Sequence, residues 1–185
     1  MTQPTSGAIP APSTMDEACF VAHFGAIYEH SPWVARCTWQ RGLGREHDAV
    51  DALAGALAAE VEAADTEAQL RLIRAHPDLG GRAGLAGELT PESAREQAGA
   101  GLDACTPAEY DRLQSLNTAY TETFGFPFVV AVKGLTREDI LQAMAQRLEN
   151  TPEVERRRAL DEIHRIARFR LEALAGPAFP LDQPA

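Results

Sequence analysis

The chain has 185 residues, of which 27 are Asp or Glu and 17 are Lys or Arg, so its formal net charge at pH 7 is −10. This length fits a single domain, and a hydrophobic content of 45% is enough to build its core. The acidic excess argues against a surface that binds nucleic acid or an anionic membrane, because such surfaces carry a basic stripe or tail. We therefore expect no nucleic-acid partner and no membrane partner.

The cysteines and the N-terminal residues indicate the cellular compartment. Cys19, Cys37 and Cys105 are odd in number and widely spaced, which favours free thiols in a reducing compartment over a disulfide framework. We expect all three to be buried as small hydrophobic side chains. The chain starts without the basic and apolar regions of a secretory signal, and no segment approaches the ~20 apolar residues of a membrane span. The sequence therefore predicts a cytoplasmic protein.

The N-terminal region predicts a tail and then a helix. Residues 1–13 are rich in Pro, Ser and Thr without periodicity, which is typical of a flexible tail. Thr14 and Glu17 have the spacing of a capping box, so we expect the first helix to start there. An amphipathic stripe follows, made of Phe20, Val21, Phe24, Ile27 and Tyr28.

Four Ser-Pro or Thr-Pro pairs predict four further helix starts. In each pair a hydroxyl that can cap the helix precedes a proline at the first helical position, where the missing N–H is no loss. Glu109 adds a capping box at the third of these starts, and Gly125 is expected to end that helix. The pairs are Ser31-Pro32, Thr90-Pro91, Thr106-Pro107 and Thr151-Pro152.

Apolar periodicity predicts the remaining helices. Stripes cover 50–61, 70–73 before Pro77, 140–148 after a Thr136 cap, and 154–174 before Gly176-Pro177. Only residues 126–132 read as a strand, and this short apolar run has no evident partner strand. We expect an all-α fold, a single helical domain over 14–176 with about seven or eight helices and irregular active-site loops. A C-terminal tail covers 177–185.

The sequence carries no recognisable metal or cofactor motif. Its five histidines show no paired-ligand spacing, and there is no phosphate-cradling glycine motif. A GxSxG nucleophile elbow is also missing. We therefore predict a protein without metal or cofactor.

Two irregular segments, 75–84 and 124–128, are the places where chemistry is expected. His76 ends a helix before a proline, so its imidazole can face a cavity with an orientation fixed by the turn. Alternatively, His76 only favours the helix dipole at a C-terminus, and spacing alone favours this second interpretation.

Three other features allow a structural and a functional interpretation. Ser93 and Glu96 share one face of a helix, where Glu96 also suits the positive end of the dipole. The phenylalanines of 124–128 can cap the core, yet the Gly and Pro between them leave backbone groups available to a small polar ligand. Arg170 can be a solvated partner of a glutamate, or it can clamp a carboxylate with both arms of its guanidinium.

These residues together resemble a known family. HPDL, a Ser-x-x-Glu-Gln seventeen residues further on, and then FGFPF form a specific ordered set. Over about residues 15–175 the chain is similar to the 2-oxo-4-hydroxy-4-carboxy-5-ureidoimidazoline (OHCU) decarboxylases. The matching stretches are FGAIYEHSPWVA (24–35), HPDLGGR (76–82), LTPES-REQ-GAGL (89–102), LN-AY-E-FGFPFVVAVKG (116–134) and EIHRIARFRL (162–171).

The resemblance implies a fold, a reaction and a set of site residues. The fold is all-helical and usually a homodimer, and the enzyme is a cofactor-independent carboxy-lyase. It makes (S)-allantoin in the last step from urate to allantoin. By motif, the catalytic residues fall on His76 and Glu96. Substrate-binding positions fall on Pro77, Ser93, Gln97, Phe124, Phe126, Phe128, Val129, Val130 and Arg170.

One residue departs from the family pattern, and two alternative functions remain open. Relatives often carry a basic residue where this chain has Thr123, which we expect at the surface, so the departure affects local ion pairing more than catalysis. A metal-free ureide hydrolase is one alternative function, although such hydrolases commonly need a metal or a nucleophile. A non-catalytic helical ligand-binding protein is the other, because apolar stripes and an acidic surface suffice for it.

Overall fold

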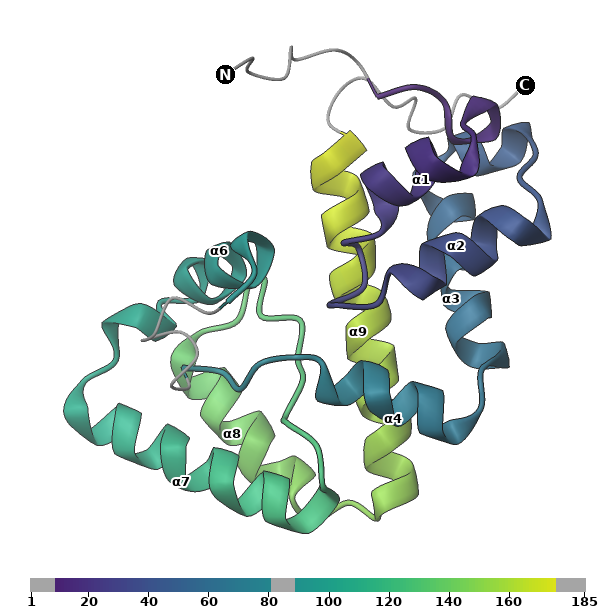
Figure 1. Cartoon of the computed structure of the whole chain (residues 1–185). Coiled ribbons are helices and arrows are strands. Elements are labelled where there is room, and N and C mark those ends of the chain that lie inside the picture. Colours follow the sequence, from purple (N-terminus) through teal and green to yellow (C-terminus); the bar gives the residue numbers. More distant parts are fainter. Residues whose placement is uncertain (1–8, 81–88, 176–185) are drawn as a thin grey trace. The chain divides into compact units, whose positions relative to one another are not determined.

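The computed structural model describes residues 9–80 and 89–175. Within these two ranges it contains eight α-helices, three short 3-10 turns and no strand (Figure 1). The predicted all-α fold with seven or eight helices is therefore confirmed. Most of the predicted N-terminal tail, the stop at Gly176 and the C-terminal tail lie outside the described residues.

The described helices fall into two compact units, the first made of Met1–Ala64 and Ala167–Ala185. In this unit α1 packs on α2, and α2 packs on α3 (Figure 1). The core is aromatic and aliphatic, with Phe20, Leu53, Leu57 and Val61 almost completely buried. Its elements are η1 (Pro12–Thr14), α1 (Glu17–Phe24), α2 (Pro32–Arg41), η2 (Arg45–Asp48), α3 (Val50–Ala63) and the end of α9 (Pro152–Ala175).

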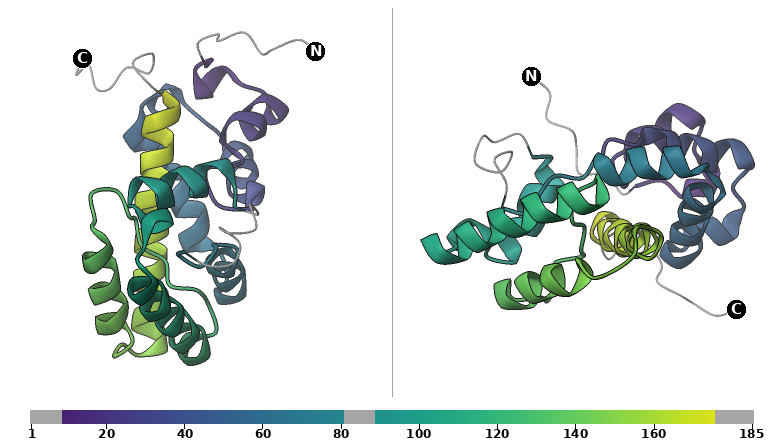
Figure 2. Two further views of the ribbon diagram at one scale, coloured as in Figure 1. Left: turned by 90° about the vertical axis from the view of Figure 1, so that its left-hand side faces the viewer. Right: turned by 90° about the horizontal axis from the view of Figure 1, so that it is seen from below.

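The second unit covers Asp65–Ile166 and contains most of the predicted site residues. Here α7 and α8 lie side by side, as Figures 1 and 2 both show. Leu72, Tyr120, Ile140 and Leu160 are fully buried in its core. Its elements are α4 (Thr66–Arg74), α6 (Pro91–Gly99), η3 (Leu102–Ala104), α7 (Pro107–Phe124), α8 (Arg137–Arg147) and the first part of α9.

Local capping chemistry sets most helix boundaries. All four Ser-Pro and Thr-Pro pairs stand at helix starts, with proline as the first helical residue. At α7 the Thr106 hydroxyl accepts the Glu109 N–H (3.3 Å), while the Glu109 carboxylate accepts the Thr106 N–H (2.8 Å). The Thr106 N–H and the Thr106 hydroxyl both donate to the Glu109 carboxylate, and these two bonds hold the pKa of Glu109 below its usual value. The same helix ends at Gly125, whose φ of 74° is left-handed and suits glycine.

The predicted start of the first helix is wrong. Helix α1 begins at Glu17 and is capped by Asp16, whose carboxylate accepts the Cys19 N–H at 2.8 Å. The Thr14 hydroxyl instead donates to the Ala11 carbonyl within the preceding 3-10 turn (2.8 Å). Asp and Thr are both good caps, and the turn over Pro12–Thr14 leaves this role to Asp16.

Other expectations about burial and strand content also change. Val154, counted in the apolar stripe of the last helix, is 53% exposed, and Leu174 is 38% exposed. The three cysteines are free, as expected, but they are half-buried rather than buried. Residues 126–132, whose sequence reads as a strand, form no strand. They connect α7 to α8 outside regular secondary structure.

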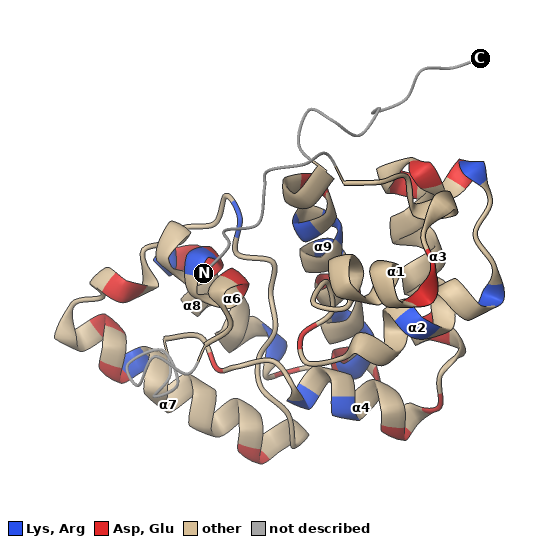
Figure 3. Cartoon of the chain, turned by 45° about the horizontal axis from the view of Figure 1, so that its top comes forward, with Lys and Arg blue, Asp and Glu red and all other residues tan. Residues whose placement is uncertain are grey.

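Acidic and basic residues are interspersed along the described helices (Figure 3). Several form exposed pairs within one helix, such as Arg168 with Glu172 (3.0 Å), and pairs of this kind contribute little to stability. Thr123 is exposed, as expected. Among the described helices, none is both long enough and apolar enough to cross a membrane.

Candidate active site

His76 lies just beyond the end of α4 and is buried, with 7% of its surface exposed. Its Nδ1 lies 3.0 Å from the carbonyl oxygen of Leu72, one helical turn earlier. Because a carbonyl only accepts, Nδ1 is the protonated nitrogen, and in the neutral ring Nε2 then carries the lone pair. The bond satisfies a carbonyl at the helix C-terminus, and the buried ring has an orientation fixed by the turn. His76 thus has the fixed ring orientation of the functional interpretation and the helix C-terminal position of the structural one.

Three side-chain amides from α6 and α7 hold the turn that follows His76. Gln97 accepts the Gly80 N–H (2.9 Å), and its amide nitrogen lies 3.4 Å from the carbonyl two residues earlier. Gln114 donates to the Gly80 carbonyl (3.0 Å), and Asn117 donates to the carbonyl just before it (2.9 Å). The backbone of 78–80 is therefore fixed by two helices that are distant in sequence.

Two of the predicted site residues of helix α6 lie on its buried face. Ser93 and Gln97 are one helical turn apart and both buried, so they share the inner face of α6. Glu96 is half-buried, at the border of that face. The Thr90 hydroxyl caps α6 by accepting the Ser93 N–H (3.3 Å). Because Gln97 contacts the turn directly, the face that carries Ser93 adjoins the segment after His76.

The FGFPF segment joins the same region through backbone and aromatic contacts. The Arg74 side chain donates from Nε to the Gly125 carbonyl at 3.0 Å, which brings the end of α4 to the end of α7. Phe124 and Phe126 stack with centroids 5.9 Å apart, and Phe128 meets Tyr120 edge-on at 5.2 Å. All three phenylalanines are buried, so the core-capping interpretation of their rings is confirmed.

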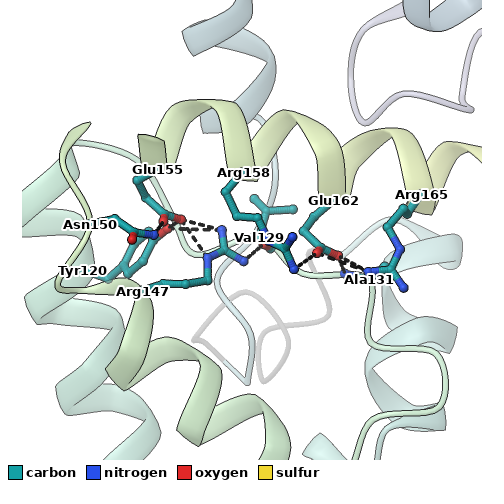
Figure 4. Close-up of polar contacts among 9 residues, drawn as sticks. All are labelled: Tyr120, Val129, Ala131, Arg147, Asn150, Glu155, Arg158, Glu162 and Arg165. Carbon is teal, nitrogen blue, oxygen red and sulfur yellow. Dashed lines mark hydrogen bonds and ion pairs between the residues drawn. The ribbon is translucent and has the colours of Figure 1, made fainter. Parts of the chain in front are cut away.

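After Phe126 the chain continues into a segment that we call the strap, residues 128–132. Val129 and Val130 are buried, although the strap belongs to no helix. The Val129 carbonyl accepts a hydrogen bond from Arg147 (2.9 Å), and the Ala131 N–H donates to Glu162 (3.0 Å). The strap is thus bound at two backbone groups by α8 and α9 (Figure 4).

Comparison with known proteins identifies the family. A family model described as OHCU decarboxylase matches residues 13–172. The chain belongs to the OHCU decarboxylase family. Proteins named 2-oxo-4-hydroxy-4-carboxy-5-ureidoimidazoline decarboxylase are similar to it: in Haloferax volcanii one is 46% identical over 157 residues (85% of this chain, 89% of the relative). In Mus musculus one is 39% identical over 164 residues (89% and 90%).

Solved structures agree with this assignment. A crystal structure of (S)-allantoin synthase superposes with a TM-score of 0.70 at 30% identity, covering 91% of this chain and 54% of that chain. A crystal structure of OHCU decarboxylase in the presence of (S)-allantoin gives a TM-score of 0.64 at 22% identity, which shows the shared fold.

Arg170 is the one predicted site residue of this OHCU decarboxylase family member that belongs to the other compact unit. It is 7% exposed, so it is not the solvated residue of the first interpretation. Its Nη1 lies 2.8 Å from the Glu29 carboxylate and 3.5 Å from the Ile27 carbonyl. The structure describes Arg170 only within its own unit, whereas the other predicted residues all belong to Asp65–Ile166.

Sequence reasoning missed the residues that hold this decarboxylase's irregular segments in place. Asn117 and Gln114 fix the turn after His76, and Arg147 and Glu162 fix the strap. Two of these carried a signal, because Asn117 and Glu162 are polar residues at apolar positions of an amphipathic helix. No motif identified their backbone partners, which lie 38 residues from Asn117 and 31 residues from Glu162.

Proposed function

We propose that the chain is a carboxy-lyase that decarboxylates OHCU to (S)-allantoin, the last step from urate to allantoin. The family match over residues 13–172 supports this reaction. The structural observation that carries the proposal is the buried His76, whose Nδ1 is held by Leu72. An imidazole with one nitrogen fixed in this way can move a proton at the other in a defined direction.

The substrate supplies its own electron sink. When the bond from C4 to the carboxylate breaks, the electron pair forms a C4–C5 double bond and the neighbouring ring C=N takes a proton at nitrogen. A proton then adds to one face of C5, and the C4 hydroxyl loses its proton to become the carbonyl of allantoin. The enzyme must therefore orient the carboxylate and deliver the C5 proton to one face.

The site residues divide these tasks. His76 acts as the general acid and base, and Glu96 orients it or binds the ureido N–H groups. Ser93 hydrogen-bonds the ligand, and Arg170 binds an anionic oxygen, as its buried guanidinium allows. Pro77, Phe124 and the backbone from Phe126 to Val130 enclose the substrate. Gln97 contributes by holding the 78–80 turn.

Chirality of the product tests the function. Freshly generated OHCU decays unaided to racemic allantoin, so circular dichroism distinguishes enzymatic from spontaneous product. Release of CO2 with optically active (S)-allantoin supports the proposal. Consumption of allantoin would point to a ureide hydrolase, and absence of both reactions would point to a ligand-binding protein.

We also propose a homodimer in the cytoplasm. The family resemblance supports the dimer, and the three free cysteines support a reducing compartment. Light scattering on a sizing column would report twice the chain mass if the dimer is correct, and a monomeric mass would contradict it.

Metal chelation should leave the activity unchanged. Because the ring C=N of the substrate accepts the electron pair, no Lewis acid is needed for the step. We expect the rate of (S)-allantoin formation after exhaustive dialysis against EDTA to equal that of the untreated enzyme. Activity that is lost on chelation and restored only by a divalent ion would contradict this prediction.

Arg170→Lys should weaken substrate binding although the charge is retained. A lysine ammonium cannot hold Glu29 and an anionic oxygen together as a planar guanidinium does. Loss of one charge-assisted hydrogen bond of about 1.5–3 kcal/mol lowers kcat/KM by about ten- to a hundredfold. Arg168→Lys is the matched control, because Arg168 is on the same helix and pairs with Asp51 and Glu172 in solvent. An unchanged kcat/KM in Arg170→Lys would remove Arg170 from the site.

A further inference from the structure

Glu162 is a fully buried acidic residue on α9 that contacts the strap directly. Its Oε2 accepts the Ala131 N–H at 3.0 Å (Figure 4). Arg158 pairs with its Oε1 at 2.9 Å, and Arg165 lies 3.3 Å from the same oxygen. Both arginine side chains are more than half exposed. They neutralise the carboxylate from the solvent side. Oε2, which accepts the Ala131 N–H, also lies 3.4 Å from Nη1 of Arg165.

Arg147 binds the strap two residues earlier. Its Nη1 donates to the Val129 carbonyl (2.9 Å), and its guanidinium carbon lies 4.4 Å from the centroid of the Phe128 ring. The guanidinium is itself fixed by the buried Glu155, which accepts from Nε at 2.9 Å. Figure 4 shows the two acidic residues of α9 along one edge of the strap.

These two bonds, one on each side of Val130, determine the direction in which the Val130 N–H and C=O point. In a planar trans peptide unit the C=O and the N–H point in opposite directions, and the described residues contain no cis peptide bond. The Val129 carbonyl and the Ala131 N–H face Arg147 and Glu162, so the Val130 N–H and C=O face away from them. Val130 is 8% exposed, and no hydrogen bond joins its backbone to another residue within 9–80 or 89–175. Buried backbone groups are almost always paired, which indicates a ligand.

We infer that Glu162 is a positioning residue for the reaction: together with Arg147 it fixes one edge of the strap, so that the Val130 N–H and C=O meet the substrate. A cyclic ureide carries both carbonyl acceptors and N–H donors, which a single peptide residue can match with one donor and one acceptor. This inference rests on the proposed function and adds the residue that prepares its binding surface.

Two substitutions at Glu162 separate positioning from charge. In Glu162→Gln, the amide oxygen still accepts the Ala131 N–H, so KM for OHCU should stay within about threefold of wild type. Glu162→Leu has a similar size but no acceptor, so the strap loses one edge bond of about 1–1.5 kcal/mol and KM should rise about five- to tenfold. We expect kcat to change less than KM, because groups that bind ground and transition states alike act on KM. Asp161→Leu removes the neighbouring exposed acid and is the matched control.

Each outcome supports or overturns the inference. A rise in KM for Glu162→Leu that Glu162→Gln largely avoids supports it. Unchanged KM in a folded Glu162→Leu, or an equal rise in both variants, overturns it. If Glu162→Leu does not fold, hydrogen exchange on wild type decides: the Ala131 amide should exchange slowly, and (S)-allantoin should slow the Val130 amide at least tenfold. No slowing at Val130 overturns the inference. A wild type that makes no (S)-allantoin from OHCU would instead reject the proposed function.

Discussion

Replacing His76 by alanine should lower kcat by about 10²–10⁴-fold, and the allantoin that still forms should have no optical activity. Without the imidazole, no group delivers the C5 proton to one face, so product accumulates at the spontaneous rate. His76→Asn should be almost as inactive. Its amide can still donate to the Leu72 carbonyl, as Nδ1 does, but it cannot titrate. The comparison separates proton transfer from the local hydrogen bond.

The matched control is His23→Asn. His23 sits at the end of another helix and bonds the carbonyl four residues earlier, with Nδ1 lying 2.8 Å from Cys19 O. It repeats the local geometry of His76 outside the proposed site, so the variant should remain active. Far-UV circular dichroism and thermal unfolding of the same preparations establish that all variants are folded. A stable His76→Ala enzyme that makes (S)-allantoin near the wild-type rate would remove His76 from the mechanism.

Arg147→Met should lower the free energy of unfolding by about 3–5 kcal/mol, because it leaves a buried charge on Glu155 without its cation. Glu155 is fully buried and accepts hydrogen bonds from Arg147, Asn150 and Tyr120. Burial raises the pKa of Tyr120, so its hydroxyl stays protonated and donates to the carboxylate. Neither neutral donor can replace the guanidinium charge. Urea unfolding monitored by far-UV circular dichroism measures the loss.

A double variant and a surface control test the cause. Arg147→Met with Glu155→Leu removes both charges, so most of the lost stability should return. Arg157→Met removes an arginine that pairs with Asp161 with its side chain 43% exposed, and it should change stability by less than about 1 kcal/mol. An Arg147→Met protein as stable as the Arg157→Met protein would show that the buried pair contributes no net stability.

Local chemistry in the sequence was sufficient for most helix starts and stops. A hydroxyl before a proline, or a glycine after an apolar stripe, determines a boundary through backbone geometry alone, as at Thr106 and Gly125. Prediction from sequence failed where two caps compete, because the choice between Thr14 and Asp16 depends on the turn that precedes them. The predicted burial of Val154 was also wrong, since an apolar residue on the first turn of a helix need not be packed against another element.

The sequence by itself determined the all-α class and the family, and it named the residues that we propose act on the substrate, because each of these is carried by residue type and short-range spacing. Only the tertiary structure decided which side chains fix the 78–80 turn and the strap. Gln97 contacts a backbone amide 17 residues away, and Glu162 contacts one 31 residues away. Irregular segments have no backbone ladder of their own, so side chains from distant helices must satisfy their polar groups. Residue type shows that Glu162 can accept a hydrogen bond, but only packing brings the Ala131 N–H to it.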